Sequence, residues 1–213
     1  MNYFKFAFFS AAFFMTNAHA DPGLDEAISR LQHEWAIVNY QTPEDRKESA
    51  FETLVGMAHD VSIRYPDHAE PIVWEAIVMA SEAKVKGGFG ALGLAKNARN
   101  LLLSAEKINP NALDGSIYTT LGSLYYKVPG WPIGFGDHEK AREYLGKALK
   151  LNPNGMDPNY FYGDLMLEDG HYDEAITYLK KALAAPSRGG REVADAGRRI
   201  EIQADLKKAQ ESR

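Results

Sequence analysis

Residues able to perform chemistry are few in this chain, and none of them is spaced for a shared site. Cysteine is absent from all 213 residues, which excludes a thiol nucleophile, a thiolate metal ligand and a disulfide. Five histidines follow the first twenty residues: His33, His59, His68, His138 and His171. No two of them lie four residues apart, and no His-Glu-x-x-His motif is present. We therefore expect neither a metal ion nor a cofactor.

Motifs of other enzyme classes are missing or incomplete. Gly134-Phe135-Gly136 lacks the preceding strand and the Lys-Ser/Thr ending of a phosphate-binding loop. No Gly-x-Ser-x-Gly turn is present, and no pair of carboxylates stands out from the many in the chain. The sequence therefore predicts a binding protein rather than an enzyme.

The first twenty residues differ in composition from the rest. Lys5 precedes an apolar run over residues 6–15, and Ala18-His19-Ala20 has the small-x-small pattern of a cleavage site. These features are typical of a secretory signal peptide at residues 1–20. We expect cleavage to leave residues 21–213 as a periplasmic or secreted protein without a cysteine for lipid attachment. The alternative is an uncleaved anchor, but a run of ten residues is too short to span a bilayer.

Composition over all 213 residues is that of one ordinary globular domain. With 45% hydrophobic and 25% charged residues, the chain can bury a sizeable core, on which an exported protein without disulfides depends. Its formal net charge of −5 argues against nucleic acid, which favours a basic surface. We expect no nucleic-acid partner, and no membrane contact after signal cleavage.

A repeat organises the rest of the chain. Apolar residues recur at helical spacing, and no stretch alternates long enough to predict a strand. Pro66, Pro110 and Pro153 each end a helix, at intervals of 44 and 43 residues, and Pro186 follows after 33. Such periods indicate stacked helix hairpins, because one hairpin cannot bury its own apolar face. The expected elements are hairpins over 24–66, 70–110, 113–153 and 156–186, and a last helix over 191–211.

The repeat residues resemble the tetratricopeptide repeat (TPR) family. Residues 156–189 fit its 34-residue pattern without a break, and the two preceding repeats fit with about eight and seven extra residues. The matching positions are Trp74, Ala98, Leu102, Ala105, Tyr118, Leu121, Gly122, Tyr125, Ala141, Leu145, Ala148, Gly163, Gly170, Ala175, Leu179 and Ala182. The resemblance implies an all-α, right-handed solenoid with a C-terminal capping helix. It also implies a non-catalytic scaffold that binds a protein or peptide in its concave groove.

Particular side chains follow from this register. Small residues such as Gly122, Ala148 and Ala175 are expected where two helices cross closely. Ala209 is expected near a frayed C-terminus, and Arg198-Arg199 on a solvated face. In the family, ligand-facing residues lie on the first helix of each hairpin. Carried over, these positions are Glu75, Met79, Glu82, Thr119, Ser123, Tyr126, Lys127, Tyr160 and Asp164.

Both long repeats are interrupted at the same place by a Gly-Phe-Gly segment, which we expect to form two neighbouring loops. Phe89, Trp131 and Phe135 project from these segments. One interpretation is a shared aromatic lid over one end of the groove, since loops on a rigid scaffold often carry binding residues. The other is that the rings tuck back over the helix ends as local cores.

A second function remains open at this point. Interrupted repeats of this kind are similar to the periplasmic helical accessory component of tripartite ATP-independent transporters, which would imply a small-molecule ligand. The last two hairpins also resemble the regulator of microtubule dynamics family, although an export signal argues against that setting. Without a cluster of arginines assigned to the groove, a carboxylate ligand is not expected. An open channel would favour a peptide or protein, and a closed pocket would favour a small ligand.

Overall fold

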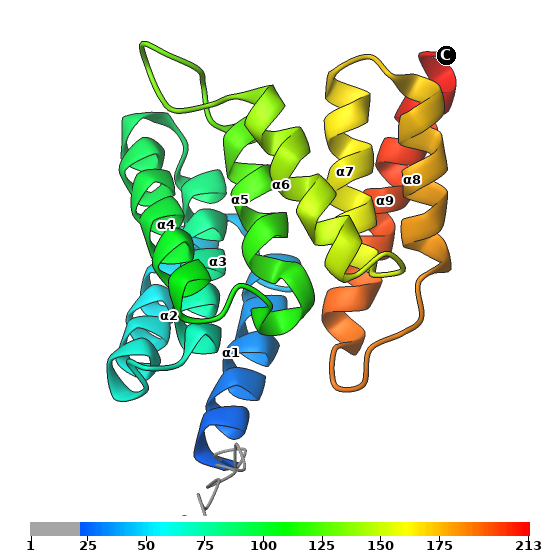
Figure 1. Ribbon diagram of the computed structural model, residues 1–213. Coiled ribbons are helices and arrows are strands. Elements are labelled where there is room, and N and C mark those ends of the chain that lie inside the picture. Colours follow the sequence, from blue (N-terminus) through cyan, green and yellow to red (C-terminus); the bar gives the residue numbers. More distant parts are fainter. Residues whose placement is uncertain (1–21) are drawn as a thin grey trace, which may run out of the picture.

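The computed structural model describes residues 22–213, so the expected signal peptide and its cleavage site lie outside the described residues. The described chain forms nine α-helices and one short 3-10 turn (Ala112–Gly115), with no β-strand (Figure 1). The helices are α1 (Pro22–Tyr40), α2 (Glu44–Arg64), α3 (Ala69–Lys86), α4 (Gly88–Ile108), α5 (Ser116–Lys127), α6 (His138–Leu151), α7 (Met156–Glu168), α8 (Tyr172–Ala184) and α9 (Glu192–Glu211).

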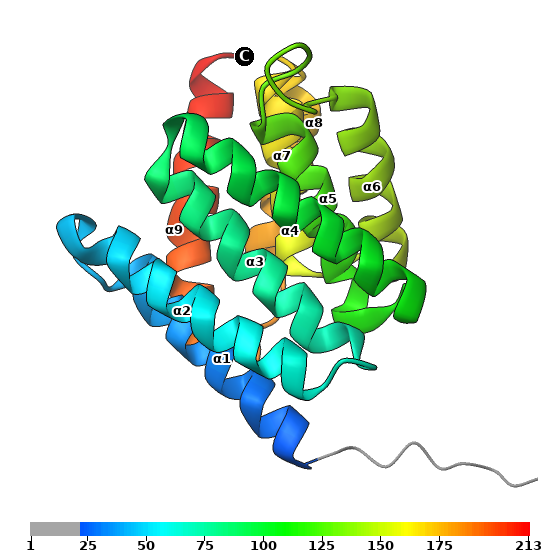
Figure 2. The same ribbon diagram turned by 90° about the vertical axis from the view of Figure 1, so that its left-hand side faces the viewer.

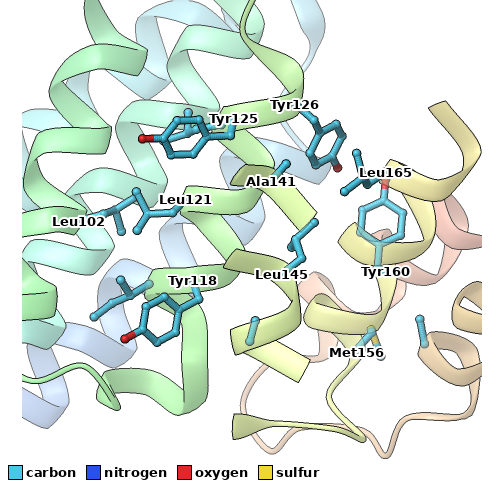
Figure 3. Packing of buried hydrophobic residues seen from close by; sticks show 14 of the residues in the cluster. Leu102, Tyr118, Leu121, Tyr125, Tyr126, Ala141, Leu145, Met156, Tyr160 and Leu165 are labelled. Atoms are coloured by element: carbon cyan, nitrogen blue, oxygen red, sulfur yellow. The ribbon is translucent and has the colours of Figure 1, made fainter. Parts of the chain in front are cut away.

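Consecutive helices pack as four antiparallel hairpins that stack in chain order. Figure 1 shows α3/α4 on the left, α5/α6 in the centre and α7/α8 on the right, and α1/α2 packs on α3. The prediction of an all-α solenoid of helix hairpins is confirmed. Each hairpin buries its apolar face against the next, as a stacked repeat requires. Figure 3 shows this packing where Leu102 of α4 meets Leu121 of α5.

Small residues lie where the helices cross closely, as the repeat register predicts. A Cβ atom on Gly122 would come 2.5 Å from Cγ of Leu145, and one on Gly163 would come 2.9 Å from Cγ of Leu179. Ala148 is fully buried. These positions leave no room for a larger side chain, because atoms of the facing helix already occupy the space.

Only one of the two expected loops exists. Helix α3 ends at Lys86, Gly87 alone links it to α4, and its φ of 63° is one that glycine adopts freely. The extra residues of this repeat therefore lengthen α3 and α4 to 18 and 21 residues instead of forming a loop. The segment 86–90 contains no proline, so nothing prevents a helix from restarting at once.

The second interruption does form a loop, over residues 128–137 between α5 and α6. Pro129 and Pro132 prevent a continuous helix there. The Gly136 amide donates to the carbonyl of Pro129 at 2.9 Å, and the Asp137 amide donates to that of Tyr125 at 2.7 Å. These bonds hold both ends of the loop against the end of α5.

The C-terminal helix packs on the last hairpin and also returns to the first one. Helix α9 contacts α7 and α8, and it also contacts α1 (Figure 2). At the α1 contact, a Cβ on Gly197 would lie 2.3 Å from the ring of Tyr40, so only glycine fits there. The expected frayed end is wrong for Ala209, which is fully buried. Helix α9 thus covers the side of the solenoid that the first helices share.

Candidate functional site

A cavity of about 840 Å³ lies between the first helices of the hairpins and α9. Its walls come from α1, α3, α5 and α7, from the first turns of α4, from the 128–137 loop and from α9 with the segment before it. The cavity therefore corresponds to the groove that the TPR resemblance predicts. The sequence left two outcomes open, an open channel or a pocket. Because α9 crosses the groove, the structure has a pocket.

Aromatic and aliphatic side chains form one wall of the cavity. Trp35 of α1 and Trp74 of α3 meet edge to face, with ring centroids 6.1 Å apart. The Nε1 of Trp35 donates to Oγ of Ser81 at 2.9 Å, which fixes the indole against α3. Ile77 and Leu92 extend the same apolar wall. Such a surface binds an apolar ligand by removing its hydrocarbon from water.

Arginines line another part of the cavity: Arg188, Arg191 and Arg198. The expectation of no arginine cluster on the groove is wrong, and so is the solvated face assigned to Arg198, which is 8% exposed. Both errors have one cause. Arg188 lies at the very end of the last repeat and Arg191 and Arg198 follow it, where the repeat register assigns no groove position, and α9 with the segment before it brings them back over the groove.

Asp157 on α7 joins two of these arginines. Its carboxylate accepts from Nη1 of Arg188 at 2.6 Å and from Nε of Arg198 at 2.9 Å. Burial alone would raise the pKa of Asp157, but Arg198 and Arg188 outweigh it and lower that pKa to about 2. Arg198 also donates to Glu201, which in turn accepts from the Tyr40 hydroxyl at 3.0 Å. The network therefore links α7, α9 and α1.

Six of the residues assigned to the ligand site line the cavity: Phe89, Thr119, Ser123, Lys127, Tyr160 and Asp164. Lys127 and Asp164 form an ion pair at 2.8 Å, and Lys127 also contacts Glu168. Five of the six assigned positions on α5 and α7 thus line the groove, and Tyr126 is the exception.

Four other assigned first-helix residues do not line the cavity: Glu75, Met79, Glu82 and Tyr126. Glu82 is buried and lies 3.8 Å from Lys86. Glu75 faces α2, where it contacts His59 at 2.9 Å and Ser62 at 2.5 Å. Met79 is buried in the core. Tyr126 is buried behind the cavity wall and donates to Asp164 at 2.7 Å.

On α3 the residues that line the cavity are Trp74, Ile77, Ala80, Ser81, Ala83 and Lys84. The register carried over to α3 is therefore displaced. The repeat pattern assigns Trp74 to the packed aromatic position, whereas Trp74 lines the groove.

The three loop rings occupy different environments. Phe89 is 93% exposed at the edge of the cavity, and Trp131 is 90% exposed without lining it. Phe135 is half-buried, with its ring 5.5 Å from Tyr125 and 4.3 Å from the Arg99 guanidinium. The local-core interpretation thus describes Phe135 alone. Ile133, which the sequence did not single out, is exposed and lines the cavity beside Phe89.

Two further features are absent from residues 22–213. No cluster of three or more His, Asp or Glu side chains in that range could hold a metal ion. Within the same residues, no helix has the length and apolarity needed to cross a membrane.

Comparison with known proteins agrees with the repeat architecture. Residues 133–196 match the tetratricopeptide repeat family. TTC0263, a thermophilic TPR protein of Thermus thermophilus, has the same fold, with a TM-score of 0.57 and 16% identity over 86% of this chain and 98% of that one. The chain is an α-helical repeat protein with a lined groove, and its residues 133–196 match the tetratricopeptide repeat family.

Two more distant structures also align with the chain. MamA aligns at 20% identity over 81% of this chain and 95% of its own, with a TM-score of 0.45. PilF of Pseudomonas aeruginosa aligns at 17% identity over 89% and 90%, with a TM-score of 0.35. Both superpose too loosely to add to the argument. No curated protein matches the sequence significantly.

Proposed function

We propose that this protein is a non-catalytic binding protein that takes a small, largely apolar ligand into the cavity between its first helices and α9. The TPR fold is typical of protein-interaction scaffolds, which agrees with binding in place of catalysis. The observation that supports a small ligand is the position of α9. It crosses the groove, so an extended peptide cannot lie along the first helices of all four hairpins.

The size and lining of the cavity agree with this ligand class. Small-molecule sites in proteins commonly occupy about 300–1,000 Å³ and combine apolar walls with a few polar groups. The present cavity of about 840 Å³ has the Trp35–Trp74 wall, with charged side chains from α7 and α9 opposite. A folded protein partner is too large for this space.

A neutral fluorescent probe, N-phenyl-1-naphthylamine, tests the proposal, because its emission rises when it leaves water for an apolar site. We expect saturable binding with one site per chain. Ala80→Phe would fill part of the cavity, since Ala80 lines it, and should weaken binding about tenfold or more. Ala204→Phe is the matched control, because Ala204 is exposed on α9 and does not line the cavity. Equal binding by both variants would exclude the cavity as the site.

A protein partner remains a second candidate, with a different surface. Phe89, Trp131 and Ile133 are 93%, 90% and 62% exposed, and all three lie on α4 or the 128–137 loop, at or near the cavity edge. Exposed apolar groups of this size often mark a docking site. On this proposal the partner would dock over the edge of the cavity rather than along the groove.

We further propose that the protein acts in the periplasm or is secreted, which rests on the signal-peptide pattern of residues 1–20. A small ligand in that compartment also agrees with a role as an accessory component of a tripartite ATP-independent transporter. The pocket and its arginines support this role, whereas the repeat positions alone assigned no arginine to the groove. Recovery of the protein in complex with the other transporter components from the native host would test it.

A further inference from the structure

We infer that the cavity ligand is a monoanion, a carboxylate on an apolar body, and that its charged group pairs with Arg191. This inference rests on the proposed small-ligand function and names the chemical class that the site selects.

Arg191 differs from the other cations that line the cavity. Each of the others has at least one carboxylate partner in the chain. Lys84 lies 3.8 Å from Glu201, Lys127 lies 2.8 Å from Asp164, Arg188 lies 2.6 Å from Asp157 and Arg198 lies 2.7 Å from Glu201. Among the described residues, Arg191 has neither an ion pair nor a side-chain hydrogen bond. It is therefore the one cavity cation within residues 22–213 that makes no direct ion pair, although Asp157 and Asp195 attract it from a longer distance.

The surroundings of Arg191 make this unpaired charge costly. Its Nε is inaccessible to solvent and has no hydrogen-bond partner, and the same is true of Nε1 of Trp74. The Arg191 guanidinium lies over the Trp74 ring, 5.3 Å from its centroid. Two buried donors thus lie side by side without an acceptor. Buried polar groups are normally hydrogen-bonded, and buried charges are normally paired.

The nearby carboxylates are directed at other cations and make no direct contact with Arg191. Asp157 already accepts from Arg188 and Arg198, and Asp195 accepts from the backbone amide and the guanidinium of Arg188. Burial, followed by repulsion from Arg188, lowers the pKa of Arg191. The negative charge of a ligand would oppose this lowering, because an opposite charge favours the protonated guanidinium.

The apolar part of the ligand follows from what surrounds this charge. Trp74 and Trp35, with Ile77 beside them, form the wall next to Arg191. One free cation suits a single negative charge, because a second charge would have to compete with the intramolecular pairs. An aromatic or medium-chain carboxylic acid combines these two properties.

A matched pair of ligands tests the charge. We would titrate the protein by calorimetry with 2-naphthoate and with its neutral isostere 2-naphthamide. Pairing with Arg191 predicts that naphthoate binds about tenfold more tightly or better, as expected for a hydrogen bond to a charged group. In Arg191→Gln the two affinities should become equal, with naphthamide binding as in the wild type.

Stability measurements separate a ligand-binding role from a structural one. Removing a partly buried charge without an ion pair should leave the melting temperature of ligand-free Arg191→Gln unchanged or raised. Lys84→Gln is the matched control, since Lys84 lines the cavity but its side chain is 79% exposed, and this variant should keep the preference for naphthoate.

Two results would overturn the inference while leaving the proposed function intact. One is equal affinity of the wild type for naphthoate and naphthamide. The other is an Arg191→Gln protein that melts lower yet still prefers naphthoate. Failure of the neutral naphthylamine probe and of both naphthalene ligands to bind would instead remove the small-ligand function, and the inference with it.

Discussion

Nε of Arg198 on α9 donates a hydrogen bond of 2.9 Å to Oδ1 of Asp157 on α7, 41 residues earlier in the chain. This contact, with that of Arg188 to the same carboxylate, ties α9 and the segment before it across the groove. The cavity exists because α9 is held there. The pair is thus a structural requirement of the site as well as part of its wall.

Protonation of Asp157 should weaken this closure. The two arginines lower the pKa of Asp157 from 3.8 to about 2, so its contribution to stability is complete above about pH 4. That contribution is lost as the pH falls from about 4 towards 2, because the unfolded state binds the proton first. Urea unfolding followed across this pH range should show a fall in the free energy of unfolding.

Asp157→Asn provides the control for this pH dependence. At pH 7 it should cost about 2 kcal/mol, since it leaves Arg188 and Arg198 without their shared partner. Its stability should then fall less steeply between pH 4 and 2 than that of the wild type. Parallel pH profiles of the two proteins would show that Asp157 does not titrate as described.

Overpacking at a helix crossing tests the repeat register. Ala148 is fully buried where α6 crosses its neighbours, so Ala148→Leu should destabilise the protein by about 1–3 kcal/mol. Ala204→Leu should change stability little, because Ala204 is exposed on α9. Ala209 is unsuitable as the neutral site, since it is fully buried. Thermal unfolding of both variants decides the point, and equal losses would contradict the register.

The hairpins could be predicted because their signals are local and repeated. Helix-ending prolines at regular intervals and small residues such as Gly122 and Gly163 recur in each unit, and both reflect the backbone contacts that stacking needs. The junction of α3 and α4 could not be read in the same way. Gly87 and Gly88 indicate a break, but a break of one residue and a loop look alike in sequence.

The site was predicted best on α5 and α7, and it was missed on α3, where the register is displaced, and beyond the last repeat. Ser123 and Tyr160 occupy first-helix positions, and both line the cavity. Arg191 and Arg198 follow the last repeat, so no periodicity assigns them a position. Trp35 lies in the most divergent hairpin, where the pattern is too weak to orient a helix. Their convergence depends on tertiary contacts between distant segments, which have no sequence signature.

Different effects are expected from the three loop rings. Phe89→Ala and Trp131→Ala should leave the melting temperature unchanged, since the two residues are 93% and 90% exposed. If a protein partner docks there, each change should reduce its capture by about tenfold or more. Phe135→Ala should instead lower stability by about 1–2 kcal/mol, because its ring packs on Tyr125 and Arg99. Melting curves and pull-down from the native host measure the two effects.

Export makes a prediction that needs no binding partner. The pattern Ala18-His19-Ala20 should direct cleavage after Ala20, so that the protein begins at Asp21. Intact-mass spectrometry of the protein from a periplasmic extract of the native host measures this end. A chain that retains Met1, or that fractionates with the membrane, would contradict the proposed compartment.

A crystal structure of the protein grown with saturating 2-naphthoate tests the central claim most directly. We predict density for one naphthoate inside the cavity, with its ring against Trp35 and Trp74 and its carboxylate within hydrogen-bond distance of Arg191. Density only on the outer surface of the hairpins, or an unchanged cavity in crystals shown to contain the ligand, would contradict a binding site between the first helices and α9.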